Sequence, residues 1–145
     1  MRSRKDRSCR HVPCSASSSV VYDFRDLVCW RLSYELKCEV VAFTSTGPAA
    51  RDFKYRDQIR DSSASAPRNI AEGFGRFRAR DSARFYEIAR ASLVETRNHL
   101  IDGRDRGYLD DNLYFRLMNL ARAAIRATTN LLLSKRRQAG DSESP

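Results

Sequence analysis

Apolar positions from residue 24 onward recur at the three- and four-residue spacing of an α-helix. The first pattern begins at Phe24 and predicts a helix that ends between Thr44 and Pro48, because Gly47 and Pro48 are helix-stopping residues. The expected apolar face consists of one stripe with Leu27, Trp30, Tyr34 and Val41 and a second with Val28, Leu32, Leu36, Val40 and Phe43. We therefore predict one long amphipathic helix in this segment.

A second helical pattern starts near Phe53 and continues to Phe74, although Pro67 lies in its middle. Proline lacks a backbone N–H and crowds the carbonyl group four residues earlier, so the helix either breaks before Pro67 or continues with a kink. The apolar phase is the same on both sides of the proline. We favour a single kinked helix.

Two further helices follow in the second half of the chain. Asp81 or Ser82 is the expected N-cap of the third helix, which ends between Gly103 and Gly107. Its expected inner face is Phe85, Ile88, Ala89, Ser92, Thr96 and Leu100. Asp110-Asp111-Asn112 is expected to cap the fourth helix with negative charge. The inner positions of that helix alternate spacings of four and three, which predicts a heptad seam of Leu113, Leu117, Leu120, Ala124, Ala127, Leu131 and Ser134.

Four helices of about 20 residues with short connections predict an all-α, up-down-up-down four-helix bundle with a proline-kinked second helix. A length of 145 residues is that of one domain, and we assign residues 21–137 to it. Residues 1–20 and 138–145 lack the apolar period and are expected to be disordered tails, of which the first is basic.

The chain carries 27 Lys and Arg against 18 Asp and Glu, a formal net charge of +9. Part of this excess lies in residues 1–20, where five basic residues face Asp6 alone. A positive field attracts polyanions such as nucleic acid or an acidic partner, and it also keeps a small protein soluble. Net charge alone therefore does not choose between these roles.

The arginines on and after the second helix are the candidate nucleic-acid-binding residues. They are Arg68, Arg76, Arg78, Arg80 and Arg84, interleaved with Phe74 and Phe77 and opposed mainly by Glu72 and Asp81. Guanidinium groups bind phosphates with two hydrogen bonds, and an exposed aromatic ring stacks on a nucleotide base. The alternative hypothesis is that these arginines form an ordinary solvated face and that the phenylalanines belong to the core.

A polar cluster beside Pro67 raises the question of catalysis. Asn69, Glu72 and Gly73 would line a pocket near a kink, or they would satisfy a carbonyl group freed near Ser63 and permit close packing. We favour the structural role, because no nucleophile and base stand at a spacing suited to acyl or phosphoryl transfer. We accordingly expect no enzyme activity, no catalytic residue and no cofactor.

The cysteines and histidines give little evidence for a metal site. Cys9, His11 and Cys14 offer three ligands where a structural zinc site needs four, so no metal is expected. Cys29 and Cys38 lie on opposite faces of one helix and cannot bond to each other. Because no apolar signal segment and no run of about 18 apolar residues is present, we expect reduced thiols, a cytoplasmic location and no membrane span.

Four ordered segments resemble a known family. They are Phe24-Arg25-Asp26-Leu27 with Trp30, then Gln58-Ile59-Arg60 with Ser65-Ala66-Pro67-Arg68-Asn69-Ile70-Ala71-Glu72-Gly73-Phe74-Gly75-Arg76, then Ile88-Ala89-Arg90 with Ser92-Leu93 and Glu95, and finally Gly107-Tyr108-Leu109. Together they cover about residues 22–135 and resemble the four-helix bundle family of the 23S rRNA intervening-sequence protein. The same pattern is similar to the bacterial-type accessory proteins of diversity-generating retroelements.

The resemblance implies a bundle bent at Pro67 that assembles as a cyclic homo-oligomer, typically a pentamer, and that binds RNA or DNA. An alternative hypothesis is a protein-protein interaction module that serves as the accessory subunit of a nucleic-acid enzyme such as a reverse transcriptase. Binding of nucleic acid, self-association and a protein partner are thus all expectations at this stage.

Overall fold

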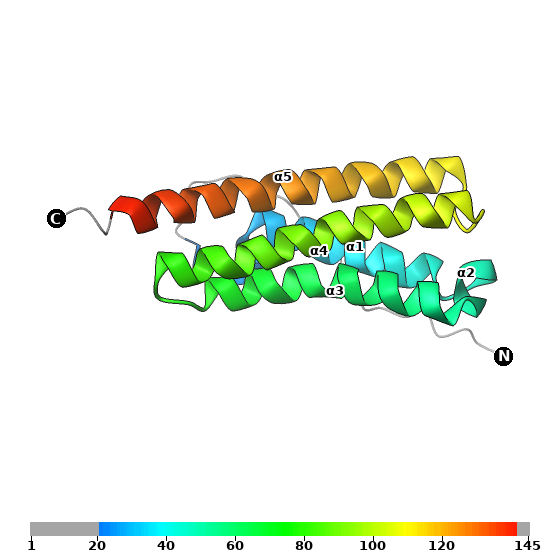
Figure 1. Cartoon of the computed structure of the whole chain (residues 1–145), viewed down its shortest axis with the longest axis horizontal. Helices are drawn as coiled ribbons and strands as arrows, with labels where there is room; N and C mark the ends of the chain where they lie inside the picture. Colours follow the sequence, from blue (N-terminus) through cyan, green and yellow to red (C-terminus); the bar gives the residue numbers. More distant parts are fainter. Residues whose placement is uncertain (1–20, 142–145) are drawn as a thin grey trace.

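A computed structural model describes residues 21–141, in which four long helices lie side by side (Figure 1). These helices are α1 (Val28–Phe43), α3 (Phe53–Phe74), α4 (Ala79–Asp105) and α5 (Asp111–Asp141). The short helices η1 (Phe24–Asp26) and α2 (Gly47–Arg51) flank α1. Because α3 contacts α4, α4 contacts α5, and α1 contacts both α3 and α5, the four helices form a closed bundle. The predicted all-α four-helix bundle is confirmed.

Pro67 lies inside α3, and the helix continues through it from Phe53 to Phe74. The prediction that this segment is one helix and does not break at the proline is therefore confirmed. The proline ring is buried, so the position that lacks a backbone donor is not open to water.

The helix ends agree only in part with the predictions. Asp110 caps α5, where its Oδ1 accepts a hydrogen bond of 2.7 Å from the backbone N–H of Leu113. In contrast, α4 begins at Ala79, before the predicted caps, because Arg78 occupies the N-cap position and the hydroxyl of buried Ser82 donates to the Arg78 carbonyl. At its C-terminus α5 extends to Asp141, so residues 138–141, predicted to belong to a disordered tail, are helical.

The sequence pattern did not predict helix α2, because it indicated Gly47 and Pro48 only as residues that end the first helix. Gly47 has a φ of 68°, a left-handed conformation that suits glycine, and Pro48 occupies the first turn of α2. The residues that end the first helix therefore also begin a short second one. They place Ala49 in the core before α3 starts.

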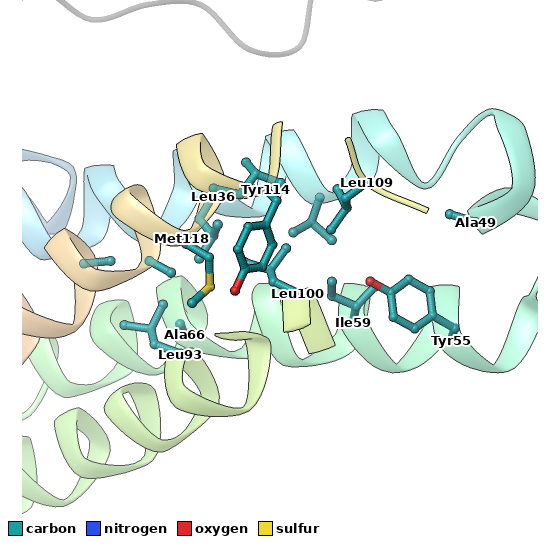
Figure 2. Close-up of a cluster of buried hydrophobic side chains, with 14 residues drawn as sticks. Leu36, Ala49, Tyr55, Ile59, Ala66, Leu93, Leu100, Leu109, Tyr114 and Met118 are labelled. Carbon is teal, nitrogen blue, oxygen red and sulfur yellow. The ribbon is translucent and has the colours of Figure 1, made fainter. Parts of the chain in front are cut away.

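The larger part of the core is built from all four long helices, as Figure 2 shows. Leu36 of α1, Ile59 of α3, Leu93 and Leu100 of α4 and Leu117 of α5 are completely buried. A second, smaller cluster contains Cys29, Ile70, Ala83, Tyr86, Ala89 and Leu132. It supports the bundle close to the turn that joins α3 to α4.

The buried faces of α1 and α5 differ from the predicted stripes. In α1 the buried residues are Cys29, Ser33, Leu36 and Val40, whereas Val28 is 62% exposed. In α5 the predicted heptad positions Leu117 and Ala124 are buried, but the rest of the buried face is Tyr114, Met118, Ala121, Thr128 and Leu132. Since α5 packs against both α1 and α4, its buried face is centred between two neighbours and is broader than a heptad seam.

Helices α3 and α4 are joined through small side chains and hydroxyl groups. The Ser92 hydroxyl donates to Ser65 Oγ (2.8 Å), and the Thr96 hydroxyl donates to Ser62 Oγ (3.0 Å). Ser62 and Thr96 are buried, so these hydrogen bonds satisfy polar groups that water does not reach.

A glycine in α4 makes room for a tyrosine from α3. A Cβ atom on Gly103 would lie 2.9 Å from Tyr55 Cζ and would overlap the Tyr55 hydroxyl oxygen. That hydroxyl donates a hydrogen bond of 2.9 Å to the His99 carbonyl. Tyr55 thus reaches the backbone of α4 only because position 103 has no side chain.

We predict that Gly103→Ala lowers the free energy of unfolding by about 1–3 kcal/mol, because the methyl group displaces Tyr55 from the core. The matched control is Gly140→Ala in α5, where nothing lies within 4 Å of the added Cβ. This control is expected to leave the free energy of unfolding unchanged or slightly raised, because Gly140 lies in the last turn of α5. Urea unfolding of the two variants tests the prediction, which is wrong if Gly103→Ala unfolds at the same urea concentration as the native chain.

The turn between α4 and α5 is fastened to the start of α3 by Asp52. Asp52 Oδ1 caps α3 by accepting from the Tyr55 N–H, and Oδ2 accepts from the Tyr108 hydroxyl (2.8 Å) and from Arg106 (3.2 Å). The Tyr108 hydrogen bond, followed by that of the Tyr55 N–H, lowers the pKa of the Asp52 carboxyl below its ordinary value of 3.8. The carboxylate therefore contributes stability at neutral pH that is lost as the pH falls through this lowered pKa.

We predict that Tyr108→Phe destabilises the protein at neutral pH and that its difference from the native chain shrinks as the solution is acidified. The variant lacks the hydrogen bond that favours the ionised form of Asp52, so it has less to lose in acid. Thermal unfolding between about pH 7 and about pH 3 measures this difference. Tyr34→Phe removes a hydroxyl with no hydrogen bond in the described residues and is the control; a pH-independent deficit in Tyr108→Phe would contradict the role of Asp52.

Candidate functional site

All five predicted arginines lie at the end of the bundle where α3 turns into α4, on the left in Figure 1. Arg68 is on the outer face of α3, Arg76 and Arg78 are in the turn, and Arg80 and Arg84 are in the first turns of α4. All five are exposed. We call Arg68, Arg76, Arg78, Arg80 and Arg84 the arginine end.

The turn is short because small residues let the two helices meet closely. A Cβ on Gly73 would lie 2.6 Å from Tyr86 Cε1, so only glycine lets α3 approach the buried Tyr86 ring of α4. After Phe74 the chain closes with hydrogen bonds from the Gly75 N–H to the Ala71 carbonyl and from the Arg76 N–H to the Gly73 carbonyl. The arginines therefore project from a turn with defined backbone contacts.

The arginines differ in whether their guanidinium groups form ion pairs or hydrogen bonds with other residues of the protein. Arg76 forms an ion pair with Glu72 and lies over the Phe85 ring at 4.7 Å. The guanidinium groups of Arg68, Arg78 and Arg84 form no hydrogen bond or ion pair in residues 21–141. These three side chains keep their full capacity to bind an anion.

Open hollows connect the arginines into one surface. One of 450 Å³ lies between Arg68 and Arg76, and another of 460 Å³ lies between Arg76 and Arg84. A third, of 640 Å³, is lined by Arg80, Arg84 and Arg136. Adjacent hollows share an arginine, so the basic surface runs from α3 across α4 to α5.

The structure adds Arg90 and Arg136 to the predicted residues. Both line a further hollow of 490 Å³, and Arg136 pairs with Glu87 across the interface of α4 and α5. The sequence signal for Arg136 was its place in the run Lys135-Arg136-Arg137, but the spacing of that run did not show which end of the bundle it reaches. Carboxylates are fewer here and are represented by Glu72, Asp81 and Glu87.

The two interleaved phenylalanines have different environments. Phe74 is half-buried, whereas Phe77 stands at the tip of the turn with 107% exposure. The hypothesis that both rings belong to the core is therefore wrong for Phe77. Arg76 and Arg78 come directly before and after this exposed ring in the sequence.

The polar cluster beside Pro67 has structural contacts. The Asn69 amide donates to the Ser65 carbonyl (2.8 Å) and to Ser65 Oγ (3.0 Å), Glu72 pairs with Arg76, and Gly73 packs on Tyr86. The sequence pattern predicts that Asn69 satisfies a carbonyl group near Ser63. In the structure Asn69 instead donates to the carbonyl group of Ser65. These contacts account for the cluster by packing and hydrogen bonding.

The two described cysteines are in different states. Cys29 is a free, buried thiol, and burial raises its pKa to about 11. Cys38 is disulfide-bonded, so the expectation of reduced thiols is wrong for this residue. The helical spacing excluded only a bond between Cys29 and Cys38 and gave no evidence on other pairings.

In the part of the chain that the structure describes, no three His, Cys, Asp or Glu side chains are grouped so that they could hold a metal ion. Cys9, His11 and Cys14 lie outside the described residues. A search of residues 21–141 also finds no helix with the length and apolar character needed to cross a membrane.

Comparisons with known proteins agree with the helical bundle. Residues 25–130 match the model of the family described as 23S rRNA-intervening sequence protein. A crystal structure of a protein of unknown function from the S23 ribosomal protein family of Bacteroides thetaiotaomicron VPI-5482 is similar with a TM-score of 0.68 and 20% sequence identity. The similarity covers 74% of this chain and 97% of that one, and it shows a shared fold. No curated protein matches the chain.

Proposed function

The chain belongs to the 23S rRNA-intervening sequence protein family, and from this membership and the geometry above we propose that it is a non-catalytic protein that binds RNA or DNA through the arginine end. The observation that carries the proposal is that Arg68 of α3, Arg78 of the turn and Arg84 of α4 lie at one end of the bundle, exposed and without a partner in the described residues. Phosphate groups suit such side chains, because a guanidinium group can donate two parallel hydrogen bonds to the oxygens of one phosphate.

Charge and shape at the arginine end fit a polyanion better than a small anion. The hollows are open and continuous, and arginines line each of them, so successive phosphates of one strand find guanidinium groups on α3, α4 and α5. Arg76 and Arg136 are held by Glu72 and Glu87, which orients them before a ligand arrives. The affinity then comes largely from phosphate neutralisation and counterion release.

We predict that the triple variant Arg68→Ser, Arg78→Ser, Arg84→Ser binds a structured RNA at least about 10-fold more weakly than the native chain. It should also reduce the slope of log affinity against log salt concentration by about 2, because up to three phosphate contacts are lost. Titration of labelled RNA between about 50 mM and about 200 mM salt measures both quantities.

A charge-matched control separates a site from an effect of net charge. Arg51→Ser, Arg122→Ser, Arg126→Ser removes the same charge from exposed positions in α2 and α5, outside the hollows of the arginine end. It should retain most of the affinity. Salt-independent binding by the native chain, or equal losses in the two triple variants, would contradict the proposal.

The alternative of a protein-protein interaction module is distinguished by the same variants. A module of that kind would bind a specific protein equally well with or without the arginines at positions 68, 78 and 84. Its RNA binding would be absent in the native chain as well as in the variants.

We further propose that the protein assembles as a homo-oligomer, for which the family resemblance implies a pentamer. Exposed apolar side chains on α4 and α5 support self-association; they are Val94, Ile101, Phe115 and Leu133. Phe115 lies beside α4, since Arg104 stands over its ring at 5.4 Å, and Leu133 lines a hollow with Arg90. Phe115 and Leu133 are therefore near the boundary of α4 and α5, and all four exposed side chains are available to a second copy.

We expect native mass spectrometry to give a particle of five chains, each of 16.6 kDa. Exchange of Val94 and Ile101 for serine should shift the mass towards a single chain, because apolar area is lost from the contact. A native chain that remains monomeric at micromolar concentration would contradict this part of the proposal.

A further inference from the structure

Phe77 is the most exposed of the large apolar side chains in the described residues. Phe77 belongs to neither core cluster of the described residues, so packing of the bundle does not require an aromatic residue at this position. The neighbouring Phe85 is different: it is half-buried and has Arg76 over its ring. Among residues 21–141, only Phe77 presents a free aromatic face at the arginine end.

The surroundings of Phe77 limit what can cover it. Arg76 and Arg78 flank the ring in sequence, and Arg80 follows one residue further, so an occupant must tolerate strong positive charge on its border. A partner helix needs an extended apolar groove to hold several side chains. A single exposed ring with arginines beside it in the sequence can instead stack on one planar group, and the arginines can bind a negative charge attached to that group.

A nucleobase with its phosphate has this combination of properties. We propose that Phe77 stacks on an unpaired base of a single-stranded or looped nucleic acid while neighbouring arginines bind the adjacent phosphates. Bases inside a duplex already stack on each other and do not present a free face, whereas unpaired bases do. This inference rests on the proposed function and adds the class of ligand: unpaired strands in preference to continuous duplex.

The test compares a short unstructured RNA with a strand of the same length and backbone that lacks its bases. Stacking of one base on an aromatic side chain changes affinity by about 10-fold. The native chain should therefore bind the unstructured RNA about 10-fold more tightly than the base-free strand. Phe77→Ala should bind the two strands equally, because only the phosphate contacts remain.

The matched control is Phe53→Ala, which removes another exposed phenylalanine at the start of α3, the opposite end of that helix from Phe77 (Figure 1). This variant should keep the preference for the strand that has bases. The inference is overturned if Phe77→Ala keeps that preference too, or if Phe53→Ala loses it to the same extent.

A fluorescent variant gives a second readout that does not depend on affinity. The only native tryptophan, Trp30, is half-buried and stacked on Tyr34 at 4.8 Å, so Phe77→Trp adds a distinct, exposed emitter. Unstructured RNA should quench its emission and the base-free strand should not. Quenching by both strands, or by neither while binding persists, overturns the stacking but leaves the arginine site intact; loss of all binding in the native chain overturns both proposals.

Discussion

The close contact between α3 and α4 is the constraint on which the rest of the structure depends. Two hydroxyl pairs, Ser92 with Ser65 and Thr96 with Ser62, join the middle of these helices, while Gly73 and Gly103 admit tyrosine rings near their two ends. Small residues along this interface bring the helices close enough for a turn of only four residues, 75–78, to connect them. The arginines gather because that turn is short and because its backbone is held by the same packing.

Much of the fold followed from the sequence because helix period and caps are local signals. The continuity of α3 through Pro67 was visible in the unbroken apolar phase, and Asp110 was recognisable as a cap by its place before an apolar run. The faces of α1 and α5 were harder to predict. Val28 is apolar but exposed and Ser33 is polar but buried, since the serine hydroxyl donates to the Cys29 carbonyl of its own helix.

The candidate site shows the same division between local and long-range information. Arg68 to Arg84 were found because they are close in the sequence, in the end of α3, the turn and the start of α4. Arg90 and Arg136 were missed because the hollow that they line forms between α4 and α5, which are packed together only in the folded chain. The ion pair with Glu87 of α4 holds Arg136 at this surface. The sequence also did not predict that Phe77 is exposed, since large aromatic residues are more often part of the core.

The central claim is that nucleic acid lies on the arginine end and not on the opposite end, where Asp52 and Tyr108 join the start of α3 to the turn between α4 and α5. Ultraviolet cross-linking of bound RNA, followed by mass spectrometry of the linked peptides, locates the contact directly. The account predicts cross-links within residues 68–90 and near Arg136. Cross-links concentrated in α2 or in residues 105–111 would contradict it.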